Sequence, residues 1–127
     1  MKRIALVEDN ADNRLLLRTL LEDRYRLVEY GSGPEALAGI VADPPDLVVL
    51  DVSLPGMDGT EVLTRLRADR RGANLPVIAL TAHAMMGDRE RLLALGFDDY
   101  VPKPVVDESA LFDTIERMIR HGNSPSP

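Results

Sequence analysis

The sequence predicts one α/β domain in which a doubly wound, five-stranded parallel sheet carries helices on both faces. Two observations predict this architecture. Short apolar runs alternate along the chain with longer stretches of helical pattern, as they do where parallel strands are joined by helices. The chain has 127 residues, the length of one domain, and 45% of them are hydrophobic, which is enough for a packed core.

Five strands are expected, and apolar runs mark four of them. Ile4–Val7, Leu47–Leu50 and Val77–Leu80 are continuous runs of four residues, and Tyr100-Val101 is a shorter run. Short apolar runs bounded by polar residues are typical of buried strands. We expect strands at residues 3–8, 26–30, 46–51, 76–81 and 98–101.

Helices are expected between the strands and after the last one. Ser32 and Asp58 each stand three residues before a glutamate, which is the pattern of a capped helix start. Gly72 and Gly96 suit helix ends. The first helix is indicated by an apolar stripe at helical spacing, made of Leu16, Leu17, Leu20 and Leu21. We expect helices at residues 11–23, 34–42, 60–70, 84–95 and 108–120.

Charge and composition exclude several classes of protein. A net charge of −6 argues against a domain that grips a nucleic-acid backbone, and the absence of cysteine excludes disulfides and thiolate metal sites. Lys2-Arg3 precedes an apolar run of only four residues, which is too short for a signal peptide or a membrane span. We therefore expect a cytoplasmic domain without direct contact to nucleic acid or membrane. The arginines of one cluster are expected to form a solvated helix end: Arg65, Arg67, Arg70 and Arg71.

Polar residues with matching chemistry follow four of the expected strands. Glu8 and Asp9 follow the first strand, Asp51 the third, Thr81 the fourth and Lys103 the fifth. The carboxyl ends of parallel strands meet at one edge of a sheet, where ligands bind in doubly wound folds. Three carboxylates packed together need a cation, and oxygen ligands favour Mg²⁺. The combination suits a divalent metal and a phosphoryl group carried by an aspartate.

Four of these residues, and Tyr100 in the last strand, also have an ordinary structural explanation. Asp9 could cap a helix, and Asp51 could be an acid in a turn. Thr81 could be a strand residue, Lys103 a solvated surface lysine and Tyr100 a core residue. All of these explanations would have to hold together at the ends of neighbouring strands, and this requirement favours the functional interpretation.

At these spacings the motifs resemble the receiver domain of two-component response regulators. The resemblance runs from Lys2 to about Arg120, and it implies the flavodoxin-like fold of receivers. The motifs that carry it are Glu8-Asp9, Asp51, Leu54-Pro55-Gly56-Met57-Asp58-Gly59, Thr81-Ala82 and Lys103-Pro104. The segments Glu8–Arg14 and Thr81–Met85 look more like receivers of hybrid histidine kinases and of single-domain chemotaxis or cell-cycle regulators than like those of transcription factors.

The resemblance implies a bacterial phosphoprotein whose Asp51 accepts a phosphoryl group from a histidine kinase or a histidine phosphotransfer protein. Lys103 and Thr81 would contact the phosphoryl oxygens, and the small Ala82 would leave room for the group to enter. Such a domain would not be an enzyme beyond its own phosphorylation and dephosphorylation.

The resemblance also implies how a magnesium cofactor would be held. Asp9, Asp51 and the backbone carbonyl of Ser53 would bind Mg²⁺ directly, and Glu8 would reach it through water.

A switch is implied as well. Thr81 would move toward the phosphoryl group and the Tyr100 ring would follow, which would remodel a partner-binding face made of the fourth helix, fifth strand and fifth helix. Gly87, expected within the fourth helix, would keep that helix adaptable. Ser53 and His83 stand where receivers tune the hydrolysis of the phosphate.

Alternatives stay open at this point. We expect residues 2–121 to form the receiver and residues 122–127 to be a disordered tail or a linker stub. The chain could be a receiver fragment of a longer regulator or hybrid kinase, or a pseudo-receiver that binds partners without phosphorylation. An aspartate-nucleophile phosphohydrolase is disfavoured because Ser53 stands where such enzymes carry a second acid. A flavodoxin-like carrier is disfavoured because Glu8 and Asp9 would repel the phosphate of its cofactor.

Overall fold

The computed structural model describes residues 1–82, 87–103 and 108–122, and these form the doubly wound sheet that the sequence predicts. Five parallel strands lie in the order β2-β1-β3-β4-β5. Each strand lies within one residue of its expected range at both ends. The strands are β1 Arg3–Val7, β2 Arg26–Tyr30, β3 Leu47–Asp51, β4 Val77–Thr81 and β5 Asp99–Pro102.

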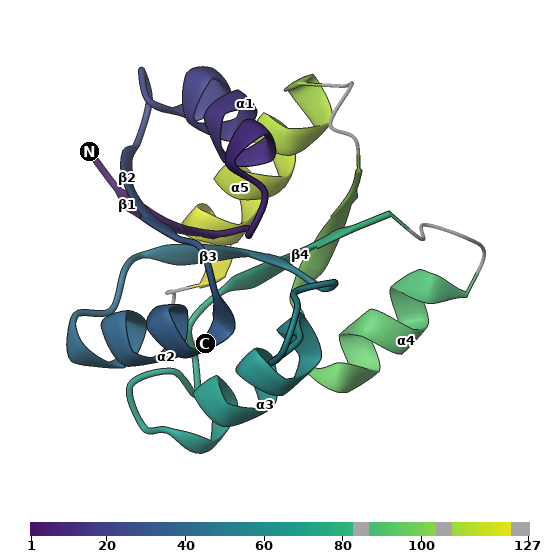
Figure 1. The fold of residues 1–127 in the computed structure, drawn as a ribbon. Helices are drawn as coiled ribbons and strands as arrows, with labels where there is room; N and C mark the ends of the chain where they lie inside the picture. The colour runs from purple at the N-terminus through teal and green to yellow at the C-terminus, as the bar shows by residue number, and fades with distance from the viewer. Residues whose placement is uncertain (83–86, 104–107, 123–127) are drawn as a thin grey trace.

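Helices cover both faces of the sheet. In Figure 1, α1 and α5 lie on one side, and α2, α3 and α4 lie on the other. The helices are α1 Ala11–Leu21, α2 Gly33–Ala42, α3 Gly59–Ala68, α4 Asp88–Leu95 and α5 Glu108–Gly122. Over the described residues, none of them combines the length and the apolar character that a membrane crossing requires.

The core consists of two apolar layers separated by the sheet. On β1, Ile4 and Leu6 belong to the layer under α1 and α5, whereas Ala5 and Val7 belong to the layer under α2, α3 and α4. This division follows from the pleat, which points successive side chains to opposite faces. Every residue of β3 and β4 is buried, as expected for central strands covered on both sides. The burial fixes the strand register and therefore where each strand ends.

The order of the strands makes the carboxyl end of β1 a switch point of the sheet. From β1 the chain passes to β2, which is the neighbour of β1 on one side within the sheet. From β2 it crosses over to β3, which is the neighbour of β1 on the other side. The connections after β1 and after β3 therefore diverge to opposite faces of the sheet. Doubly wound proteins bind their ligands at this kind of switch point.

Side-chain caps begin three of the helices. Asn10 accepts a hydrogen bond from the backbone N–H of Asn13, Ser32 from that of Glu35, and Asp58 from that of Glu61. The caps Ser32 and Asp58 confirm the predicted starts of α2 and α3. At α1 the cap is Asn10, so the capping alternative for Asp9 is wrong.

Several expected helix boundaries are corrected. Gly87 precedes α4 rather than lying inside it, because its φ of 91° is left-handed and cannot continue a helix. Residues 84–86 of the expected helix lie outside the described residues, as does His83. Helix α1 ends at Leu21 instead of residue 23, and α5 continues to Gly122. The rest of the expected tail, 123–127, also lies outside the described residues.

The leucine stripe of α1 is narrower than expected. Leu17 and Leu21, one helical turn apart, are buried, and Leu20 is half-buried. Leu16 is 43% exposed, and its neighbour Leu15 is 51% exposed. A helix turns about 100° per residue, so the residue next to a buried position points partly away from the core.

The expected solvated arginine cluster is wrong for Arg67, which lies half-buried between several loops. Its guanidinium donates hydrogen bonds to the carbonyl oxygens of Gly72 at 3.0 Å, Leu75 at 2.6 Å and Gly96 at 2.9 Å. It also forms an ion pair with Asp98 at 3.0 Å. Arg67 therefore joins the loop after α3 to the end of α4 and to the segment that leads into β5.

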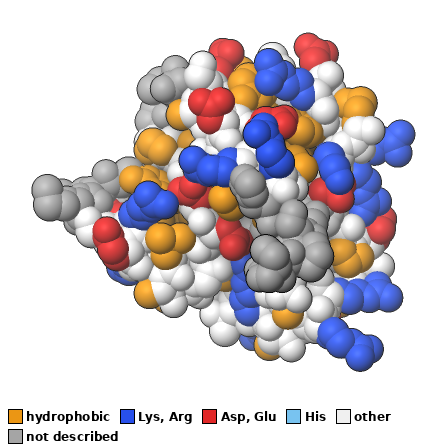
Figure 2. All heavy atoms as spheres, turned by 180° about the vertical axis from the view of Figure 1, so that it is seen from behind, with side chains coloured by type: hydrophobic (Ala, Val, Ile, Leu, Met, Phe, Trp, Pro, Cys, Tyr) orange, Lys and Arg blue, Asp and Glu red, His pale blue; other side chains and the backbone are white. Residues whose placement is uncertain are grey.

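The other charged side chains are distributed over the surface. On the face drawn in Figure 2, Lys and Arg side chains are interspersed with Asp and Glu side chains. Arg65 pairs with Glu61 at 2.9 Å across one turn of α3. Arg71 donates to the carbonyl oxygens of Val41 and Ala42 at the end of α2. Exposed pairs of this kind each contribute little to stability.

Arg67→Met should destabilise the fold much more than Arg65→Met on the same helix. The first substitution leaves partly buried carbonyl groups without a donor, which we expect to cost about 2 kcal/mol or more. The second removes one exposed ion pair, worth about 0.5 kcal/mol or less. Urea unfolding of both variants checks this, and equal losses would contradict the structural role of Arg67.

Candidate functional site

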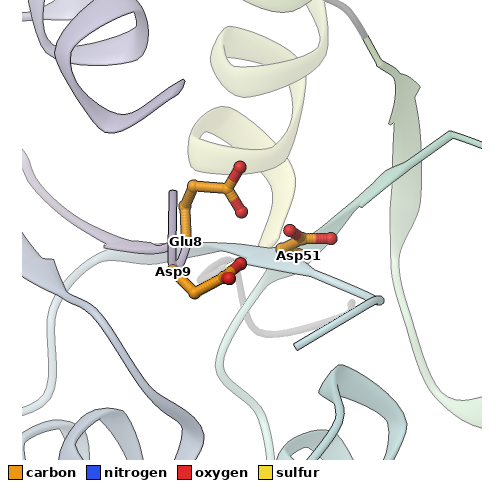
Figure 3. A group of neighbouring side chains, drawn as sticks. All are labelled: Glu8, Asp9 and Asp51. Atoms are coloured by element: carbon orange, nitrogen blue, oxygen red, sulfur yellow. The ribbon is translucent and has the colours of Figure 1, made fainter. Parts of the chain in front are cut away.

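Three carboxylates meet at the carboxyl edge of the two central strands. Glu8 and Asp9 directly follow β1, and Asp51 is the last residue of β3. One carboxylate oxygen of each residue lies within 4.8 Å of those of the other two, and Figure 3 shows the three side chains gathered at this edge. Glu8 is fully buried, Asp51 is 2% exposed and Asp9 faces solvent. The cluster is therefore open to solvent on the side of Asp9.

Lys103 brings a positive charge to this cluster from the end of β5. Its Nζ donates to Asp51 Oδ2 at 2.9 Å and to Glu8 Oε1 at 3.2 Å. The backbone N–H of Lys103 donates to the carbonyl oxygen of Thr81 at 2.8 Å, which fixes the chain after β5 beside the end of β4. The ammonium thus bridges carboxylates that follow two different strands.

Burial and charge oppose each other at this site. Burial, followed by the neighbouring Asp51 carboxylate, raises the pKa of Glu8 to about 7. Burial alone would lower the pKa of the Lys103 ammonium, but its hydrogen bonds to Asp51 and Glu8 outweigh this effect and raise the pKa. The site therefore favours a cation next to its carboxylates.

The two oxygens of Glu8 have different surroundings. Oε1 accepts a hydrogen bond from Asn13 Nδ2 at 2.6 Å in addition to that from Lys103. Oε2 is buried and has no hydrogen-bond partner among the described residues. A buried carboxylate oxygen without a partner is unfavourable in a dry protein interior and is a ready ligand for a cation or its water.

The backbone around Asp51 is held by close packing. Asp51 Oδ1 accepts a hydrogen bond from the N–H of Ser53 at 2.9 Å. A Cβ on Gly59 would lie 2.2 Å from the Asp51 carbonyl oxygen, so only glycine fits where α3 starts. The N–H of Gly59 donates to the carbonyl oxygen of Val52 at 2.9 Å. The segment from Leu54 to Gly59 thus ties the start of α3 to the end of β3.

Thr81 and Tyr100 lie on the next two strands. Thr81 ends β4 and is 3% exposed, and Tyr100 is half-buried on β5 against the apolar layer under α2, α3 and α4. The register pairs Ala79 with Tyr100, so the tyrosine lies below the carboxyl edge that holds Lys103. Ser53 is exposed beside Asp51, and His83 lies outside the described residues.

Sequence reasoning missed two residues that support the cluster from α1. Asn13 contacts Glu8 as described above, and Arg14 Nη1 donates to the carbonyl oxygens of Glu8 at 2.7 Å and Asp9 at 3.2 Å. Arg14 also faces Glu29 of β2 at 3.7 Å. Their position in the sequence could have indicated this role, because the first turn of a helix that starts directly after a strand lies over the end of that strand.

The donor set fits a hard divalent cation. It contains only oxygen ligands, from the carboxylates of Glu8, Asp9 and Asp51, and that of Asp9 faces solvent. Mg²⁺ prefers such ligands and commonly keeps several waters. The same edge offers the Asp51 carboxylate as a nucleophile beside the Lys103 ammonium.

Comparison with known proteins agrees with this geometry. A family model of the response regulator receiver domain matches residues 4–116. The chain is 45% identical over 107 residues to the sensor histidine kinase GacS of Pseudomonas protegens, an alignment that covers 81% of this chain and 12% of that kinase. It is 41% identical over 105 residues to the polar-differentiation response regulator DivK of Brucella ovis, covering 82% of this chain and 85% of DivK.

A solved structure is similar throughout. The receiver domain of a sensor histidine kinase from Pseudomonas aeruginosa, which has a magnesium ion coordinated in its active site cleft, superposes with a TM-score of 0.85. The two sequences are 34% identical, and the match covers 94% of this chain and 98% of that one. Fold, carboxylate edge and relatives agree: this chain belongs to the receiver domains of two-component signalling.

Proposed function

We propose that this receiver is a magnesium-dependent phosphoacceptor switch in which Asp51 takes a phosphoryl group from the phosphohistidine of a histidine kinase or a histidine phosphotransfer protein. One observation carries the proposal. The Asp51 carboxylate lies 2.9 Å from the Lys103 ammonium at the edge where Glu8 and Asp9 supply two further carboxylates. Nucleophile, positive charge and cation ligands are thus within reach of one phosphoryl group.

The cation ligands would be Asp9, Asp51 and the carbonyl oxygen of Ser53, with Glu8 acting through water. When bound, Mg²⁺ supplies positive charge that offsets the charge on the transferred phosphoryl oxygens. The magnesium in the cleft of the Pseudomonas aeruginosa receiver supports this assignment.

The residues of this chain would then divide the transfer between them. An Asp51 oxygen forms a bond to phosphorus while the phosphorus–nitrogen bond of the phosphohistidine breaks, and the imidazole leaves with the electron pair of that bond. Lys103 neutralises a phosphoryl oxygen as a mobile point charge. Thr81 donates its hydroxyl to another oxygen, and the small Ala82 leaves the entrance free.

Phosphorylation would change the surroundings of Lys103 and Thr81, and this change would alter the binding of a partner protein. Thr81 moves toward the phosphoryl group, and the Tyr100 ring follows from the next strand. The partner-binding face would be formed by α4, β5 and α5. Helix α4 is suited to rearrangement because Leu92 is its only buried residue in the described part and Gly87 provides no side-chain cap.

The net charge of −6 and the interspersed charges in Figure 2 support a protein partner rather than a nucleic acid for this domain. The likeness to DivK and to the GacS receiver supports a protein that acts by binding a partner or by passing the phosphoryl group onward. The exposed Ser53, together with His83, would tune the lifetime of the phosphate.

Asp51→Asn should abolish the covalent adduct. We expect intact-mass measurement after incubation with acetyl phosphate and Mg²⁺ to show one added phosphoryl group on the wild type and none on the variant. Asp12→Asn, which alters an exposed aspartate on the first turn of α1, is the matched control and should be phosphorylated normally. An undiminished adduct on Asp51→Asn would show that the acceptor is another residue.

Glu8 should make stability depend on pH near neutrality. Its pKa is about 7 in the folded protein against about 4.5 ordinarily, so the folded state holds this proton more tightly. The Glu8 contribution to the free energy of unfolding therefore decreases as pH rises from about 4.5 to about 7. We expect the wild type to lose stability relative to Glu8→Gln between about pH 5 and pH 8 in urea unfolding.

Adding Mg²⁺ at about pH 8 should restore stability to the wild type more than to Glu8→Gln, because a bound cation offsets the ionised Glu8. Parallel pH profiles for the two proteins, with equal responses to Mg²⁺, would contradict the role given to Glu8.

The chain has three tyrosines, which allows a direct test of the switch. With fluorinated tyrosine, beryllofluoride and Mg²⁺ should shift the ¹⁹F signal of Tyr100 and leave that of Tyr25 nearly unchanged. Tyr25 is held by a hydrogen bond to Glu116, far from the carboxylate edge. In Lys103→Ala the Tyr100 shift should be smaller at saturating ligand. An unchanged Tyr100 signal in the wild type would exclude Tyr100 from the switch.

A further inference from the structure

We propose that Asn13 is a positioning residue for the cation site: by holding Glu8 Oε1 it fixes the orientation of the Glu8 carboxylate, including when Lys103 leaves Glu8 for a phosphoryl oxygen. This inference rests on the proposed function and assigns a part of it to a residue outside the receiver motifs.

Asn13 is itself firmly placed. It lies in the first turn of α1, where its backbone N–H donates to the Oδ1 of the capping residue Asn10 at 3.0 Å. Its side-chain Nδ2 donates to Glu8 Oε1 at 2.6 Å. The backbone of Arg14, the next residue, donates to the carbonyl oxygen of Asn10 and continues the helix. The amide of Asn13 is thus presented to Glu8 from a fixed turn.

Two donors share one oxygen of Glu8. Asn13 and Lys103 both donate to Oε1, while Oε2 is buried without a partner among the described residues. A carboxylate fixed through one oxygen cannot easily rotate to exchange its two oxygens. The hydrogen bond from Asn13 therefore fixes how the Glu8 carboxylate is turned at the acid cluster.

The two donors differ in charge and in freedom to move. Lys103 also donates to Asp51, at 2.9 Å, and would be drawn to a phosphoryl group arriving there. Among the described residues, the Asn13 side chain donates to Glu8 and to no second carboxylate, and Asn13 lies on a helix. Because its amide is neutral, it orients Glu8 without cancelling the negative charge that a cation requires. Residues that orient a ligand in this way commonly change metal affinity 10- to 100-fold when removed.

The test is calorimetric titration of Mg²⁺ into the full chain and its variants, without any phosphodonor. Asn13→Leu keeps nearly the same volume and removes the donor. We expect it to weaken Mg²⁺ binding about tenfold. Asn13→Ala, which cannot crowd the site, should do the same. Asn74→Leu, at an exposed asparagine before β4, is the matched control and should bind like the wild type.

A double-mutant cycle separates positioning from a general effect on the fold. If Asn13 acts through Glu8, then Asn13→Leu should have little further effect on Mg²⁺ affinity in a Glu8→Gln background. An equal loss in both backgrounds would overturn the inference, because Asn13 would then act by another route.

The outcomes also distinguish the inference from the proposed function. If both Asn13 variants bind Mg²⁺ with the affinity of the wild type, the role of Asn13 is overturned but the proposed function is not. Absence of Mg²⁺ binding by the wild type would overturn both.

Discussion

Mutual repulsion of the carboxylates at the ends of β1 and β3 is the constraint on which the site depends. Glu8 and Asp51 are buried next to each other, and Asp9 lies beside them. Such a group is tolerated only if positive charge compensates it. Here Lys103 supplies one positive charge from β5 against three carboxylates, and burial is the main cause that raises the pKa of Glu8. The remaining electrostatic deficit is what a divalent cation would satisfy.

The fold supports this arrangement from several directions. Burial of β3 and β4 on both faces fixes where their last residues lie. The close approach of Gly59 to the Asp51 carbonyl group brings the start of α3 against the same edge. Asn13 and Arg14 hold the β1–α1 connection through hydrogen bonds to Glu8. The like charges therefore lie at the edge of buried central strands, while α4, with one buried residue in its described part, is left adaptable.

The sequence predicted the strands to within one residue because apolar runs of four report burial directly, and the polar residues that follow them were predicted to share an edge. The sequence could not reveal the structural role of Arg67. The partners of Arg67 are the backbone carbonyl groups of Gly72, Leu75 and Gly96, and every residue type carries such a group. The exposure of Leu16 depends on how α1 is rotated against the sheet. The hydrogen bond between Asn13 and Glu8 depends on the tertiary placement of a single turn.

A crystal structure of the wild-type chain with Mg²⁺ and beryllofluoride tests the central claim most directly. The account predicts beryllium bonded to a carboxylate oxygen of Asp51, a magnesium ion between Asp9 and Asp51, and Lys103 Nζ on a fluoride instead of on Glu8. Beryllofluoride on another carboxylate would contradict the account. A structure in which Lys103 keeps its 3.2 Å contact with Glu8 while the ligand is bound would also contradict it.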